Sequence, residues 1–438
     1  MKPLMTLTSL AFALSLGTTL VGAGSSAVAQ ASSGEPIKLG IVTFLSGPAA
    51  GPFGIPARNA AELLIGAIND GSMPAPYNKP GFGGAKAEFK FVDEAGSTAT
   101  QVTELRNLVQ RDQVDAVVGY VASGNCLAVA PVAEELQTLT VFFDCGTPRI
   151  FEERAYKYVF RTAPTSTMDN VAAARYAAQK VKNLTSYSGI NQNYAWGQDS
   201  WRDFVLTMKK VAPNAKVNKE LFPKLFAGEY GAEISTLLTS GSQAIHTSFW
   251  GGDLESFILQ SAARGLAQRS PLVLTTGETA MFRLGPKMPD GSIIGARGPH
   301  GVLAHDSELN RWFQKAYADR YGTPPTYPTY HMAQAVLGLK AAYDKAAEKT
   351  GNRPTKDDVV TAFEHLEFQA ASTTIRMVLG KGHQAISDTA YGTYRFNKAE
   401  SQPEIADVIR YPAECVNPPE NMTADAWLEQ GMPGAKCE

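Results

Sequence analysis

The sequence has few of the residues and motifs that mark an enzyme or a nucleic-acid-binding protein. Its 438 residues carry a formal net charge of −2, so there is no basic field that would hold nucleic acid. It contains none of the motifs G-x-S-x-G, H-E-x-x-H, G-x-x-x-x-G-K-[ST] or G-x-G-x-x-G. The six histidines are scattered, and no carboxylate spacing makes His300 and His305 a metal pair. We therefore expect no catalytic group, no metal and no cofactor.

Long apolar stretches are also rare, and the N-terminus has the only one. Lys2 precedes an apolar run from Leu4 to Val21, and small residues follow at 27–29. This order is typical of a secretory signal peptide, with cleavage expected near Ala29. No other segment approaches the 18 apolar residues of a membrane-spanning helix. We expect an exported protein with a signal peptide at residues 1–29.

Cysteine is scarce, but its number is even. Four cysteines in an exported chain favour disulfide bonds, and three pairings of four are possible. We favour Cys126 with Cys145, because both would lie at the carboxyl ends of adjacent strands, and Cys415 with Cys437, which would staple the tail. The alternative is that Cys126 and Cys145 are free, buried thiols.

Residues 115–148 organise the rest of the chain. Ala116–Val118 and Leu139–Phe143 are short apolar runs typical of parallel strands buried on both faces, with one helix between them. Ser123 is the expected N-cap of that helix. Because ligands of open α/β sheets bind at the carboxyl ends of strands, Ser123 and residues 145–147 should face one crevice. Their hydroxyls and N–H groups would suit a carboxylate, although a capping serine and a loop threonine are the plainer interpretation.

The chain then resembles a known family. Residues 35–42, EPIKLGIV, and the loop Ser46-Gly47-Pro48 resemble the start of the branched-chain amino-acid and amide-binding periplasmic proteins, the type I substrate-binding family of ABC transporters. The Ser123 loop, the Thr147 loop and residues 195–199 follow in that family's order and spacing. The resemblance covers nearly all of the chain after residue 34. It implies an α/β fold of two doubly wound, Rossmann-like domains joined by a three-strand hinge, the periplasmic binding protein type I fold.

The domain boundaries follow from this resemblance and from the alternation of strands and helices. We expect an N-terminal lobe of residues 36–162 plus 299–374 and a C-terminal lobe of residues 163–298 plus 375–414. A tail of residues 415–438, stapled by a disulfide, would follow. The chain would cross between the lobes at 162–165, 297–300 and 372–380, and residues 391–396 and 405–411 would add strands to the second lobe.

The resemblance also implies the ligand contacts. Ser123, the Cys145 carbonyl and Thr147 would hold an amino acid's carboxylate, and Glu278 would balance its ammonium. Asp253 and Trp196 stand where a leucine-type binder has tyrosines. The remaining candidates are aromatic residues that would line the pocket: Phe53, Tyr120, Trp250 and Tyr327. His331, close to Tyr327 at a helix start, is a further candidate lining residue.

These inferences predict an extracytoplasmic solute-binding protein. We expect a periplasmic, monomeric receptor that closes on an amino acid (branched-chain, hydrophobic or aromatic) or a related small amphipathic solute and delivers it to an ABC permease. A first alternative keeps the fold but binds amides, urea or aromatic carboxylates. A second is an extracytoplasmic sensor, and a third is a secreted hydrolase, which the missing motifs disfavour.

Overall fold

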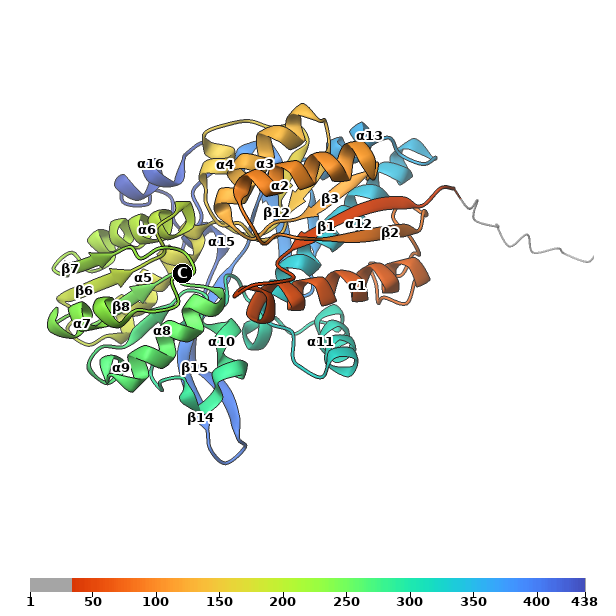
Figure 1. The fold of residues 1–438 in the computed structure, drawn as a ribbon. Coiled ribbons are helices and arrows are strands. Elements are labelled where there is room, and N and C mark those ends of the chain that lie inside the picture. The colour runs from red at the N-terminus through yellow and green to blue at the C-terminus, as the bar shows by residue number, and fades with distance from the viewer. Residues whose placement is uncertain (1–33, 438) are drawn as a thin grey trace, which may run out of the picture. The chain divides into compact units, whose positions relative to one another are not determined.

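Two β-sheets organise residues 34–437, the part of the chain that the computed structural model describes (Figure 1). The predicted signal peptide lies outside these residues. The first sheet has eight strands in the order β11-β12-β13-β5-β4-β3-β1-β2, and the second has seven in the order β15-β14-β10-β9-β8-β6-β7. We call each sheet with its helices a lobe. Every helix within residues 34–437 is too short or too polar to span a bilayer.

The first lobe has a parallel centre and an antiparallel edge. β1 to β5 pair in parallel, β13 pairs in parallel with β5, and β11 and β12 continue antiparallel. Its strands are β1 (Ile37–Thr43), β2 (Ala87–Asp93), β3 (Ala116–Gly119), β4 (Leu139–Phe142), β5 (Val159–Arg161), β11 (Glu367–Gln369), β12 (Thr374–Val378) and β13 (Gln384–Ile386). Its main helices are α1 (Ile55–Asp70), α2 (Thr98–Arg106), α3 (Ser123–Glu135), α4 (Arg149–Glu152), α11 (Glu308–Tyr321), α12 (Tyr327–Thr350) and α13 (Lys356–Phe363).

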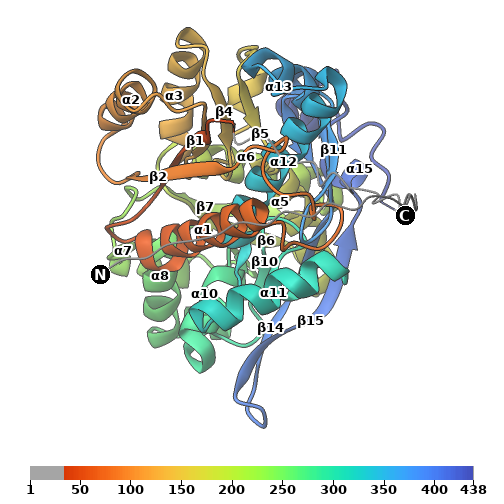
Figure 2. The same cartoon turned by 90° about the vertical axis from the view of Figure 1, so that its right-hand side faces the viewer.

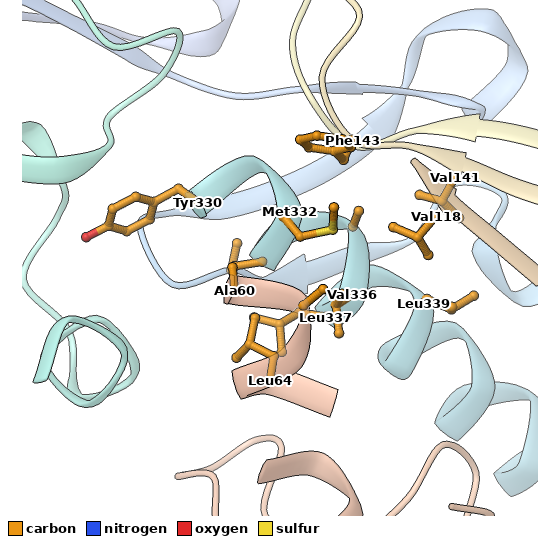
Figure 3. Close-up of a cluster of buried hydrophobic side chains, with 14 of the residues drawn as sticks. Ala60, Leu64, Val118, Val141, Phe143, Tyr330, Met332, Val336, Leu337 and Leu339 are labelled. Carbon is orange, nitrogen blue, oxygen red and sulfur yellow. The ribbon is translucent and has the colours of Figure 1, made fainter. Parts of the chain in front are cut away.

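Helices cover both faces of the first sheet because its central strands are apolar on both sides. β3 and β4 are buried throughout. In Figure 3, Val118 and Val141 of these strands lie with Val336 of α12 and Leu64 of α1 in one buried cluster. A second cluster joins the opposite face to α2 and α3. Figure 2 shows α1 and α11 side by side. Burial on both faces holds these central strands in place.

The second lobe repeats this plan and ends in a long hairpin. Its strands are β6 (Ser186–Ile190), β7 (Lys216–Leu221), β8 (Ile245–Thr247), β9 (Leu272–Leu274), β10 (Ile293–Gly295), β14 (Thr389–Asn397) and β15 (Gln402–Tyr411). Its main helices are α5 (Ser166–Lys180), α6 (Ala195–Val211), α7 (Gly231–Thr239), α8 (Gly251–Ala263), α9 (Leu266–Arg269) and α10 (Glu278–Leu284). β14 and β15 add strands to the second lobe, as predicted, and they pair antiparallel at the edge of the sheet.

The chain passes between the sheets three times, and the third passage differs from the prediction. The first two lie between β5 and α5 and after β10, at the predicted places. The third follows β13, at residues 387–388, not at 372–380. The reason is that residues 374–386 first form two strands of the first sheet, and Arg161 of β5 holds the second of them by donating to Gln384. Residues 375–386 therefore belong to the first lobe.

The tail packs against the second lobe. α15 (Ala413–Val416) and α16 (Ala424–Glu429) contact α5 and α6, and Trp427 is buried there. Cys415 is bonded to Cys437, one of the two pairings favoured from the sequence. The backbone N–H of Ala424 donates to the Glu152 carboxylate of the first lobe at 2.7 Å. The tail thus contacts both lobes.

Candidate functional site

One cavity is lined by residues of both lobes at the carboxyl ends of their strands. It is lined by Phe53, Val121, Asp144, Gly146, Tyr194, Trp196, Trp250, Thr276, Arg297 and Tyr327. Its volume is about 10 Å³, which is close to the space that one water molecule needs. A larger solute therefore enters only when the lobes move apart or the lining side chains turn.

Aromatic residues make up half of the cavity lining, and four of them were predicted. Phe53 lies 5.5 Å from Trp250 and 5.3 Å from Tyr327, ring centre to ring centre, in edge-to-face contacts. Trp250 Nε1 donates to the Tyr194 hydroxyl at 2.7 Å. Trp196, in the first turn of α6, donates through Nε1 to the Ser248 carbonyl at 2.8 Å. Because the Nε1 atoms of Trp196 and Trp250 are paired with protein groups, these two rings offer the cavity apolar faces.

Ser123 and Thr147 lie together, as expected, but they contact protein groups. α3 begins at Ser123 with Ala122 as its N-cap, so the predicted capping role of Ser123 is wrong. The Ser123 hydroxyl instead accepts from the Thr147 N–H at 3.2 Å. The Thr147 hydroxyl donates to Asp199 of the second lobe at 2.6 Å, and Arg149 also pairs with Asp199. This pair therefore ties the first lobe to the second.

Cys145 and Tyr120 lie behind the cavity. Cys145 is bonded to Cys126, the other favoured pairing. Its carbonyl accepts from Arg161 Nη1 at 2.5 Å. Tyr120 is buried beside Phe142 in the cluster that α2 and α3 cover, and it is absent from the cavity lining. Their predicted contacts with a solute stay predictions.

The two predicted acids of the second lobe are held by backbone N–H groups. Asp253, in the first turn of α8, accepts from Gln192 Nε2 at 2.8 Å and from the Phe226 N–H at 2.7 Å. Glu278, the first residue of α10, accepts from the Tyr327 N–H of the first lobe at 2.9 Å. Burial raises the pKa of Glu278 to about 8. Burial therefore favours the protonated form of this carboxyl, and neither acid lines the cavity.

A buried charge cluster stands at the second crossing, beside the cavity. Arg297 donates through Nε to Asp169 of α5 at 2.9 Å and through Nη1 to the Asp144 carbonyl at 3.0 Å, and it also pairs with the Asp144 carboxylate. Its guanidinium lies 4.5 Å from the centre of the Trp196 ring, in a cation–π contact. Asp144 follows β4 and Asp169 is in α5, so Arg297 joins the two lobes. Burial raises the pKa of Asp169, and the Arg297 guanidinium opposes this rise by stabilising the carboxylate.

His331, the further candidate lining residue, belongs to this cluster instead. Its Nδ1 lies 3.0 Å from Asp144 Oδ1 and its Nε2 lies 2.9 Å from the Arg297 carbonyl. Burial lowers the pKa of His331. The ring is therefore held between the two charged residues and is absent from the cavity lining.

Sequence reasoning missed Asp144 and Arg297 as site residues. Both follow directly on strands: Asp144 comes two residues after β4 ends, and Arg297 two residues after β10 ends. The strand-end rule that selected Cys145 would have selected them too. Their pairing carries no local signal, because 153 residues separate them.

Comparison with known proteins places the chain in a family. The family model described as periplasmic binding protein matches residues 36–399. A leucine-, isoleucine-, valine-, threonine- and alanine-binding protein of Pseudomonas aeruginosa is 26% identical over 230 residues, which are 51% of this chain and 58% of that protein. Leu/Ile/Val-binding protein homolog 4 of Brucella melitensis is 24% identical over 72% of this chain and 73% of its own length. The chain thus spans less than two thirds of the Pseudomonas relative.

Solved structures share the fold. A solute-binding protein of an ABC transporter from Rhodopseudomonas palustris BisB5, in complex with 3,4-dihydroxybenzoic acid, has a TM-score of 0.74 at 19% identity, covering 86% of this chain and 98% of that one. A leucine-binding protein from Thermotoga maritima MSB8 has a TM-score of 0.69 at 17% identity, covering 85% and 98%. Two α/β lobes, a lobe-spanning cavity and a match over residues 36–399 agree: the chain belongs to the periplasmic binding protein family.

Proposed function

We propose that the chain is the periplasmic receptor of an ABC importer, which captures an amino acid or a related small amphipathic solute between its lobes and delivers it to a permease. The family consists of solute-binding proteins, which are not enzymes, and its members deliver small molecules to ABC transporter permeases. The observation that carries the proposal is the cavity to which each lobe contributes aromatic rings. Phe53 and Tyr327 come from the first lobe, and Trp196 and Trp250 from the second.

Closure follows from this arrangement. A solute that touches rings of both lobes stabilises the form in which the lobes meet, because it loses its contacts with one lobe when they part. The contacts of Thr147 and Arg149 with Asp199 also join the two lobes directly when the lobes meet. The permease then distinguishes loaded from empty receptor by the relative placement of the two lobes.

The relatives and structural neighbours differ in the class of solute that their names give. The Pseudomonas relative is named for leucine, isoleucine, valine, threonine and alanine, and several structural neighbours are complexes with benzoate or hydroxybenzoates. The aromatic wall would accept an aliphatic or an aromatic body. We propose an amino acid as the first candidate and an aromatic carboxylate or an amide as the second.

A thermal-shift screen tests the proposal. The protein, purified from the periplasm of an expression host, is heated with a panel of amino acids, amides, amines and aromatic acids. A solute that binds only the native state increases the free energy of unfolding by RT ln(1 + [L]/Kd) and so raises the melting temperature. We expect at least one such solute with micromolar affinity, confirmed by calorimetric titration, and no turnover of it. A panel without any shift, or chemical conversion of a bound amide, would contradict the proposed function.

A further inference from the structure

The cavity has one polar corner that its own protein groups leave incomplete. Asp144 lines the cavity and its side chain is 1% exposed. Its Oδ1 meets Arg297 and His331, whereas its Oδ2 is buried and has no hydrogen-bond partner among residues 34–437. A buried carboxylate oxygen without a donor costs free energy on the order of 1 to 3 kcal/mol or more. A donor supplied from the cavity would remove that cost.

The corner made by Ser123 and Thr147 differs in this respect. The Thr147 N–H and hydroxyl both have acceptors already, Ser123 Oγ and Asp199 Oδ2. The Trp196 ring also packs so closely on Gly146 that a Cβ atom there would collide with it. The ring thus covers the loop that a carboxylate would have to reach.

Charge balance argues against a solute carboxylate at the Asp144 corner. Arg297 is the one cationic side chain that lines the cavity, and two carboxylates, Asp144 and Asp169, already pair with it. Its Nη2 donates to the Pro164 carbonyl at 3.1 Å. A solute carboxylate would be a third acid for one guanidinium, and a buried charge without a partner costs several kcal/mol. An N–H donor, in contrast, adds no negative charge and supplies the hydrogen bond that Asp144 Oδ2 lacks.

We propose that Asp144 is the anchor of the solute's polar head group, and that this head group is an N–H donor, an ammonium or an amide. This inference rests on the proposed function and specifies its chemistry. The N–H group donates to Asp144 Oδ2, while the rings of Trp196, Trp250 and Phe53 enclose the apolar body. Arg297 is a positioning residue, because its ion pair with Asp144 orients that carboxylate and stabilises its buried negative charge.

The first test changes the charge of Asp144 and compares it with a matched control. Asp144→Asn and Asp169→Asn each remove one carboxylate from Arg297, but only Asp144 lines the cavity. For a solute that the thermal-shift screen identifies, we expect Asp144→Asn to weaken binding by about tenfold or more and Asp169→Asn to change it by less than about threefold. Tighter or equal binding to Asp144→Asn would overturn the inference.

The second test needs no variant and so stands if Asp144→Asn fails to fold. The wild-type protein is titrated with compounds that share a body and differ in head group: benzylamine, benzamide and benzoate, and isopentylamine, 4-methylpentanamide and 4-methylpentanoate. The inference expects the tightest member of a binding set to be the amine or the amide, by about tenfold over the carboxylate. An amine preference assigns an ammonium head group, and an amide preference a neutral one. If the carboxylate binds most tightly in a set, the inference about the head group is overturned while the proposed function stands. If the protein binds no solute from the whole panel, the proposed function itself is contradicted.

Discussion

The cavity has two polar corners, one formed by Ser123 and Thr147 and the other by Asp144, and they differ in the hydrogen-bonding groups that they offer to a solute. At the first, Ser123 and Thr147 bond to one another and to Asp199, so the polar contacts stay within the protein. At the second, Asp144 is tied to Arg297 and His331 through one oxygen, and its other oxygen has no partner in the described chain. Strand-end position selects both corners. The hydrogen-bond partners distinguish a corner that joins the lobes from one that can receive a solute.

The largest expected effect concerns Arg297, on which the second corner depends. Arg297→Met leaves Asp144 and Asp169 buried without their cation, and losing one partner of a buried ion pair costs about 3 to 5 kcal/mol. Urea unfolding followed by circular dichroism measures this loss. The control is Arg395→Ala, because Arg395 and Asp407 form a pair whose side chains are 60% and 47% exposed. We expect the control to lose less than about 1 kcal/mol, and a similar loss in both variants would contradict the role given to Arg297.

The second prediction concerns Glu278, another acid with an oxygen that lacks a partner in the described chain. Burial raises its pKa to about 8 from 4.5, so the native state keeps a proton that the unfolded chain has released between these values. The free energy of unfolding therefore falls as pH rises from about 4.5 to 8. Glu278→Gln should remove the part of this pH dependence that comes from the Glu278 carboxyl. That part lowers the free energy of unfolding by on the order of a few kcal/mol at pH 8 and by little at pH 4.5.

Unfolding curves at pH 5, 7 and 8.5 check the Glu278 prediction. Glu367→Gln, at an exposed strand position, is the control and should leave the pH slope unchanged. Glu94, whose pKa burial also raises to about 8, should keep part of the slope in the Glu278→Gln protein. Parallel slopes for wild type and Glu278→Gln would show that the carboxyl is ionised in the native state.

The two disulfides allow a third comparison, because they close loops of similar length in different places. The separations are 19 and 22 residues, so each bond should stabilise the fold by a similar amount, about 3 kcal/mol. Cys126 and Cys145 flank both polar corners, whereas Cys415 and Cys437 lie in the tail. Replacing the first pair by serine should therefore lower solute affinity as well as stability, and replacing the second pair should lower stability alone. Equal losses of affinity in calorimetric titrations would contradict this distinction.

The sequence predicts the scaffold better than the site. Buried strands such as β3 and β4 follow from short apolar runs, and two of the three crossings follow from the family resemblance and the alternation of strands and helices. The buried strands β10 and β13 were not predicted. β7, KVNKEL, went unpredicted because it is an edge strand whose side chains are mostly exposed, so it has no apolar run. The third crossing was misplaced because residues 374–386 fold back onto β5 by long-range pairing.

The site itself depends on distant contacts. The family resemblance, together with the clustering of aromatic residues, predicted four of the wall residues: Phe53, Trp196, Trp250 and Tyr327. No local pattern indicates that Arg297 reaches Asp169, which lies 128 residues earlier, or that Thr147 is bound to Asp199. A resemblance of order and spacing transfers positions, but it does not transfer hydrogen-bond partners.

The smallest expected effects are at the first corner, where the family resemblance implies the carboxylate contact. If its partners are protein groups, Ser123→Ala should change solute affinity by less than about threefold, since it removes one weak acceptor. Thr147→Val should lower the free energy of unfolding by about 1 kcal/mol, because it removes the hydrogen bond to Asp199 between the lobes while Arg149 and Arg202 still pair with Asp199. It should also weaken solute binding slightly more than Ser123→Ala does. Calorimetric titration of both variants with the same solute measures this. A loss of about thirtyfold or more in Ser123→Ala would mean that the hydroxyl releases Thr147 and binds the solute directly; the head group would then be a carboxylate at Ser123, and Asp144 would hold the hinge alone.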